Sequence, residues 1–120
     1  MADRMLFIGW GTPVPGREEA AIECFNEAVG FYGRVQQEGK IESFDVVLLD
    51  PNAELGGYIE LHGSAQQLSA LAESDEFRRL QAQVSLIVGD NRIIGGVMNE
   101  GVAREMAIYT DAVSKVPQSA

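Results

Sequence analysis

The sequence has little cysteine, little histidine and few basic side chains. The single cysteine, Cys24, excludes an internal disulfide and a zinc site built from cysteines. Lysine and arginine together number 9 against 18 acidic residues, which gives a net charge of −9. Nucleic-acid binding needs a clustered basic stripe, and Arg78 with Arg79 is the only adjacent basic pair. We therefore expect no nucleic-acid partner.

Long apolar runs are also missing. The apolar run at residues 5–10 is too short for a secretory signal and is followed by glycine and proline. No stretch approaches the ~20 apolar residues that span a bilayer, and an acidic surface is repelled by anionic lipids. The sequence therefore predicts a cytoplasmic chain with no membrane partner. Its length suits one domain over residues 1–120.

Local patterns predict most of the secondary structure. Apolar runs rich in β-branched and aromatic residues predict strands at residues 4–10, 40–50 and 58–62. Apolar residues at spacings of three and four predict helices at residues 17–38, 64–80 and 100–116. Ser64 and Gln67 match a capping box, and Ser74 marks a break with a second cap. The expected apolar stripe of the first helix is Ile22, Phe25, Val29 and Tyr32, and that of the last helix is Val102, Met106, Tyr109 and Val113.

Residues 84–98 allow two interpretations. Residues 84–88 are strand-like, residues 89–91 form a turn, and residues 92–98 suit a strand or a strand extension. The whole segment is then either one bent strand or a hairpin. In both cases the element order is the split βαβ arrangement. The expected fold class is α+β: a ferredoxin-like βαββαβ domain with an antiparallel sheet and a C-terminal helix.

The second strand predicts a dimer because it is apolar on both sides. Its apolar residues alternate between the two faces, with Phe44, Val46 and Leu48 on one and Val47 and Leu49 on the other. Two crossover helices cover one face of such a sheet, and an exposed second apolar face exceeds what monomers tolerate. The simplest cover is an identical sheet in a two-fold homodimer. The alternative is that the terminal helix folds back over this face and the chain stays monomeric.

One segment adds a resemblance to the element order. Residues 74–80, Ser-Asp-Glu-Phe-Arg-Arg-Leu, precede the last strands, and similar S-x-x-F/H-x-x-L segments precede the last strand of dimeric α+β barrel proteins. The chain resembles this superfamily over nearly its whole length, and most of all its uncharacterised small members. The resemblance implies two sheets packed face to face and a cleft between helices and sheet for small organic molecules. Relatives include cofactor-free monooxygenases, proteins that handle haem or chlorite, and stress-response or dehydratase-like proteins.

The candidate catalytic residues are Glu60 and His62. They share one face of the third strand, where a carboxylate beside an imidazole can form a proton-transfer pair. Glu60 would hold the imidazole charged and orient it. The competing interpretation is a histidine at an exposed strand end.

Four further residues are expected to bind a ligand in the same cleft. Trp10 ends a strand beside a loop, which is a common position for a pocket rim. Tyr32 lies on the stripe of the first helix, and Tyr58 shares the face of His62. Asp45 lies among apolar residues, where a carboxylate needs a partner. The competing interpretations are a core aromatic for Trp10 and an outward-facing carboxylate for Asp45.

The other signatures of chemistry are missing, so we expect no cofactor and no metal. Gly9, Gly11 and Gly16 lack the spacing of a dinucleotide fingerprint, and Pro13 and Pro15 remove amides that a phosphate needs. One histidine and scattered carboxylates give no ligand cluster, and Cys24 is expected to be a buried, inert thiol. Two hypotheses remain: a protein that binds or transforms a small organic molecule, and a non-catalytic dimerisation or regulatory module.

Overall fold

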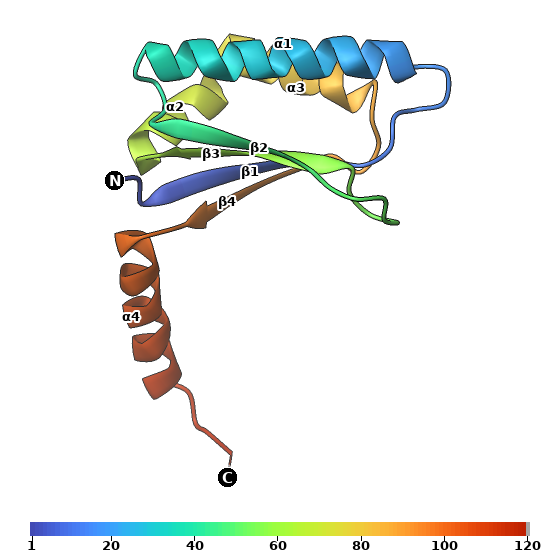
Figure 1. Cartoon of the computed structure of the whole chain (residues 1–120). Helices are drawn as coiled ribbons and strands as arrows, with labels where there is room; N and C mark the ends of the chain where they lie inside the picture. The colour runs from blue at the N-terminus through green and yellow to red at the C-terminus, as the bar shows by residue number, and fades with distance from the viewer. Residues whose placement is uncertain (120) are drawn as a thin grey trace.

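The computed structural model describes residues 1–119 and has the ferredoxin-like α+β fold, with a helix added at the C-terminus (Figure 1). The four strands form one antiparallel sheet in the order β2-β3-β1-β4. The elements are β1 (Arg4–Trp10), α1 (Glu18–Gln37), β2 (Ser43–Leu48), β3 (Gly57–Gly63), α2 (Ala65–Glu73), α3 (Asp75–Ser85), β4 (Arg92–Val97) and α4 (Glu100–Ser114). The fold class expected from the sequence is thereby confirmed.

Helices α1, α2 and α3 cover one face of the sheet and form the core with it (Figure 1). The expected stripe of α1 is wrong at Ile22, which is 63% exposed, whereas Tyr32 is buried, Val29 packs against the core and Phe25 packs on Trp10. The stripe had been assigned to the largest apolar side chains, whereas the face against the core includes small residues at the same helical period. The buried residues of α1 are Cys24, Ala28, Phe31, Tyr32 and Val35.

Two serine caps divide the second helical segment as expected. The Ser64 hydroxyl accepts a hydrogen bond from the Gln67 amide at 3.1 Å, and the Gln67 side chain accepts one from the Ser64 amide at 2.9 Å. This reciprocal pair is the capping box. Ser74 caps α3 by accepting a hydrogen bond from the amide of Phe77, so α2 and α3 are separate helices.

Residues 84–98 form neither a bent strand nor a hairpin. Helix α3 continues to Ser85, and β4 is the only strand of the segment. Val84, Ile87 and Val88 continue the helical spacing of Leu80, and Ile87 and Val88 are buried in the core. The apolar run at residues 84–88 therefore forms the end of α3 and the turn after it. Val88 keeps one strand-like feature, an isolated bridge to Pro13.

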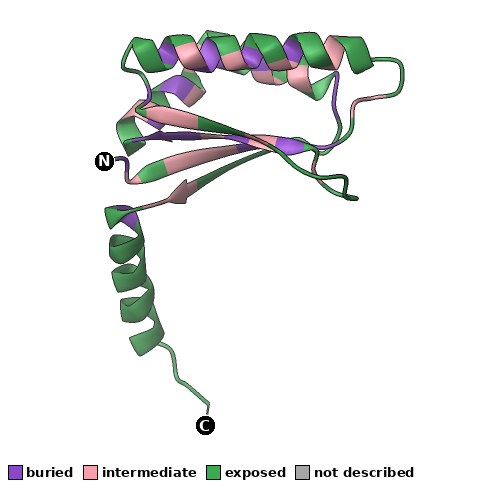
Figure 2. Ribbon diagram, in the orientation of Figure 1, coloured by how far each residue is buried: buried purple, intermediate pink, exposed green. Residues whose placement is uncertain are grey.

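The second face of the sheet, called the open face below, carries Phe7, Tyr58 and Ile94 and has no covering layer within residues 1–119 (Figures 1 and 2). Helix α4 leaves β4 and points away from the sheet, and nearly all of it is exposed (Figure 2). The radius of gyration is 17.1 Å, against about 14 Å for a compact chain of this length. The terminal helix therefore does not fold back over its own sheet. Neither α4 nor any other described helix has the length and apolar character to cross a membrane.

Candidate functional site

The six residues singled out in the sequence lie on both sides of the sheet. In β3, Ile59 and Leu61 are buried towards the helices, so Tyr58, Glu60 and His62 lie on the open face. Asp45 pairs with Glu60 across β2 and β3 and shares that face. Trp10 and Tyr32, in contrast, line a cavity on the helix side. The structure thus divides the single expected cleft into two separate places.

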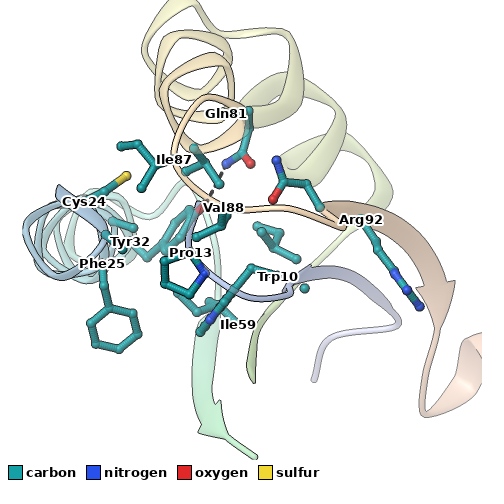
Figure 3. Close-up of a pocket in the computed structure, with 16 residues that line it drawn as sticks. Trp10, Pro13, Cys24, Phe25, Tyr32, Ile59, Gln81, Ile87, Val88 and Arg92 are labelled. Carbon is teal, nitrogen blue, oxygen red and sulfur yellow. Dashed lines mark hydrogen bonds between the residues drawn. The ribbon is translucent and has the colours of Figure 1, made fainter. Parts of the chain in front are cut away.

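The cavity lies between the helices and the sheet and has a volume of about 110 Å³ (Figure 3). Its walls come from α1, β1, β3, α3 and the segment that joins α3 to β4. The walls are mainly apolar, and Trp10 packs edge-on against Phe25 with 5.9 Å between ring centroids. The few polar groups among the lining residues include Tyr32, Gln81, Asn91 and Arg92.

Tyr32 places a phenol in this apolar setting. It is 1% exposed, and the Gln81 side-chain amide donates a hydrogen bond of 3.2 Å to its oxygen. Burial raises the pKa of Tyr32 above its ordinary value, an effect that the hydrogen bond from Gln81 opposes. The phenol is therefore protonated at neutral pH and keeps a proton to donate. Gln81 was not foreseen, because nothing in the sequence distinguishes it from the other glutamines of α2 and α3.

Cys24 belongs to the wall of the same cavity and is buried, as expected. Burial raises the pKa of the Cys24 thiol, and the carboxylate of Glu27 raises it further. A thiol in this setting stays protonated, whereas nucleophilic attack and metal binding need the thiolate. Cys24 therefore contributes apolar surface to the cavity.

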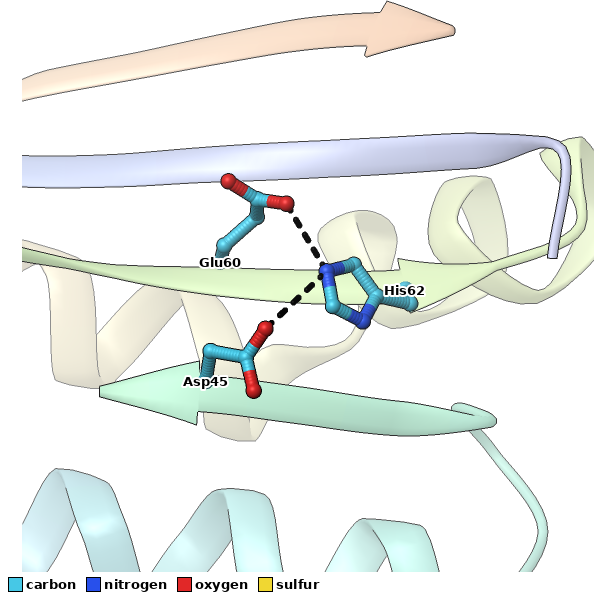
Figure 4. A group of neighbouring side chains, drawn as sticks. All are labelled: Asp45, Glu60 and His62. Atoms are coloured by element: carbon cyan, nitrogen blue, oxygen red, sulfur yellow. Dashed lines mark hydrogen bonds and ion pairs between the residues drawn. The ribbon is translucent and has the colours of Figure 1, made fainter. Parts of the chain in front are cut away.

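On the open face, three side chains form a cluster that we call the His62 cluster: Asp45, Glu60 and His62 (Figure 4). The His62 Nε2 atom lies 2.8 Å from Glu60 Oε1 and 3.7 Å from Asp45 Oδ2. The other ring nitrogen, Nδ1, lies 2.9 Å from the hydroxyl of Ser43. Strand pairing brings these groups together, since Asp45 lies opposite Glu60 and Ser43 lies opposite His62.

The His62 cluster corrects the statement that the carboxylates are scattered. One nitrogen and two carboxylate atoms lie within 4.8 Å of one another, and this donor set is one that divalent cations use. The three residues had been assigned to one cleft, but not as a set of metal ligands, because Asp45 is separated from Glu60 and His62 in the sequence by a loop. A hairpin register that pairs Asp45 with Glu60 would have revealed the cluster. The same register would have revealed Ser43, which was not foreseen either.

The fold and these two places define a ferredoxin-like domain with an apolar cavity between its helices and its sheet and with one uncovered sheet face. No protein-family model matches the chain, and no curated protein is significantly similar to it. Its structure is similar to that of a dimeric protein of unknown function and ferredoxin-like fold from Bacteroides fragilis, with a TM-score of 0.60 and 9% sequence identity. The match covers 79% of this chain and 96% of that one. At this identity the likeness shows the fold alone.

Proposed function

We propose that this chain binds a small, mostly apolar organic molecule that carries a hydrogen-bond acceptor. The observation that carries the proposal is a buried phenol in the wall of an apolar cavity. The volume of about 110 Å³ is comparable with the engineered apolar cavities of about 150 Å³ that bind benzene. Such walls favour a ligand through burial of its apolar surface, at about 25 cal/mol per Å².

The phenol supplies the specificity. Because the amide of Gln81 already donates to the Tyr32 oxygen, the natural partner for the phenol proton is an acceptor on the ligand, such as a carbonyl. A buried hydrogen bond contributes about 1 kcal/mol net. The proposed ligand class is therefore a small ketone, aldehyde or ester with an apolar body.

The proposed working form is a homodimer. The open face presents Phe7 against Tyr58, with 4.8 Å between ring centroids, beside an Ile94 that is 54% exposed. Helix α4 presents a second apolar stripe, made of Val102, Met106, Tyr109 and Val113, and all four side chains are exposed. The similar protein from Bacteroides fragilis is described as dimeric. A second copy would cover both surfaces at once.

The contacts at the start of α4 favour covering by a second copy, because they keep the helix from folding back onto its own sheet. The Met98 amide donates to the Asp3 carbonyl at 3.0 Å, and Arg104 forms an ion pair with the Asp3 carboxylate. Gly101 packs so closely on the Asp3 carbonyl that a side chain would not fit there. These contacts fix the direction in which the helix leaves β4. A lone helix of 15 residues is marginally stable in water, so α4 needs a partner for its apolar stripe.

The test is an NMR titration of the labelled protein with acetophenone and with ethylbenzene, which have similar shapes but differ in the carbonyl. We expect both probes to shift the amide signals of cavity residues and the indole signal of Trp10, the only tryptophan. Acetophenone should bind more tightly, and Tyr32→Phe should remove about fivefold of that preference, the equivalent of about 1 kcal/mol. Tyr109→Phe, which removes an exposed hydroxyl, is the matched control.

Two results would contradict the proposal. One is the absence of shifts at cavity residues with either probe at millimolar concentration. The other is an unchanged preference in Tyr32→Phe. Sedimentation that then still shows a dimer would favour the second candidate function, a non-catalytic dimerisation module, which the exposed stripe of α4 supports. A catalytic role of Glu60 and His62 stays a prediction, and it would operate on the opposite side of the sheet from the cavity.

A further inference from the structure

We infer that the His62 cluster binds a divalent cation of the first transition row, such as Zn²⁺ or Mn²⁺. The site is separate from the cavity and does not depend on the ligand proposed there. It consists of one imidazole nitrogen and two carboxylates on the open face, carried by two adjacent strands (Figure 4). Three protein ligands with a remaining position for water are a common arrangement for such an ion.

The distances suit the ion with one small adjustment. Ligand atoms about 2.0–2.2 Å from a metal lie about 3–3.5 Å from one another. Glu60 Oε1 and His62 Nε2 are 2.8 Å apart, close to that spacing. Asp45 Oδ2 is 3.7 Å from Nε2 and needs to move slightly inward. The Asp45 side chain is 69% exposed, so this movement displaces no packed neighbour.

The imidazole is held in position on its other side. The Ser43 hydroxyl lies 2.9 Å from Nδ1, and the ring itself is largely buried. When the hydroxyl accepts the Nδ1 proton, Nε2 presents its lone pair to the space shared with the two carboxylates. Metal-bound histidines commonly have such a second hydrogen bond, which fixes the tautomer and the ring plane. Ser43 is therefore a positioning residue for the site.

Charge favours a cation at this place. In the described part of the chain, His62 is the only group that forms an ion pair with Asp45 or Glu60. Even a protonated imidazole leaves the three side chains with a net charge of −1, on a chain that already carries −9. A divalent cation with a neutral imidazole brings the cluster to zero. That balance matters most beside apolar neighbours such as Phe7 and Tyr58, where an unbalanced charge is costly to cover.

The donor types predict which ions bind. Imidazole nitrogen suits zinc, iron, nickel and copper, whereas carboxylate oxygens suit manganese, magnesium and calcium. One nitrogen with two carboxylates therefore favours zinc most, and manganese is expected ahead of magnesium because affinity rises along the first transition row from manganese onward. Calorimetric titration of chelator-treated protein should show one Zn²⁺ or Mn²⁺ per chain and at least tenfold weaker binding of Mg²⁺. Bound Mn²⁺ should broaden the amide signals of residues 43–45 and 60–62 before those of α1.

Variants assign the ligands. His62→Ala and Asp45→Asn should each weaken Zn²⁺ binding at least tenfold, and Ser43→Ala should have a smaller effect. Asp50→Asn, which removes an exposed carboxylate in the loop after β2, is the matched control and should change nothing. Since Asp45 is exposed, its variant keeps the test valid even if His62→Ala fails to fold. The inference is overturned if neither Zn²⁺ nor Mn²⁺ binds below 1 mM, or if binding survives Asp45→Asn and His62→Ala unchanged.

Discussion

The two faces of the sheet differ in how completely one chain covers them. On the helix side, Leu61 and Ile59 are buried beneath three helices, and a small apolar cavity remains among them. On the open face, Phe7 and Tyr58 pack on each other, while the Ile94 side chain and the Asp45 carboxylate of the His62 cluster remain exposed. The core and the cavity therefore belong to the single chain, whereas the open face is left uncovered by residues 1–119.

The largest effect is expected from a charge placed on the open face. Ile94→Glu would place one carboxylate from each copy in the proposed dimer interface, beside the carboxylates of the His62 cluster. Because burying unpaired charge costs several kcal/mol, we expect the dimer to dissociate at least 100-fold more readily. Sedimentation at micromolar concentration measures this. Ile22→Glu, the same change on the exposed side of α1, should leave the mass unchanged.

A wild-type chain that sediments as a monomer at those concentrations would refute the dimer. The proposed interface would also be refuted if Ile94→Glu and Ile22→Glu both remained dimeric. The first result would also leave the stripe of α4 without an explanation, because the contacts of Asp3 with Met98 and Arg104 direct that helix away from its own sheet.

The element order was predictable from the sequence because it rests on local signals. The caps at Ser64 and Ser74, for example, depend on residues three positions apart. The His62 cluster was predictable only in part. Strand alternation placed Glu60 and His62 on one face, but the approach of Asp45 depends on the register between β2 and β3, which places it opposite Glu60. Trp10 and Tyr32 lie on the helix side of the sheet and the other candidates on the open face, and this separation was missed for a similar reason. Strand alternation showed which residues share a face, but only the packing of the helices showed which face is covered.

A second prediction compares matched truncations on the two faces. Leu61 is 0% exposed, so Leu61→Ala should lower the free energy of unfolding by about 3 kcal/mol at any protein concentration. Phe7→Ala should cost less in dilute protein and more as the concentration rises, because binding of a second copy stabilises the folded chain by mass action. Urea denaturation at two concentrations, a hundredfold apart, measures both effects. A Phe7→Ala cost that is independent of concentration would show that the open face is complete in the monomer.

The smallest expected effect concerns Tyr32 and appears only at alkaline pH. Burial raises the pKa of Tyr32 in the folded chain, whereas the unfolded chain releases this proton near pH 10. Above pH 10 the folded state therefore binds more protons than the unfolded state, and stability falls as pH rises. The stabilising contribution is complete below pH 10. The loss should be at most about 1.4 kcal/mol per pH unit for one group, and Tyr32→Phe should remove that slope.

Denaturation of wild type and Tyr32→Phe between pH 8 and pH 11 measures the difference in slope. Tyr109→Phe, which removes an exposed hydroxyl instead of the buried one, is the matched control and should keep the wild-type slope. If Tyr32→Phe and wild type lose stability in parallel, the phenol reaches water in solution, and the cavity is more open than its apolar walls indicate. Saturation with acetophenone should raise the wild-type stability without changing this slope, because the folded phenol stays protonated over the whole range and the ligand binds that form.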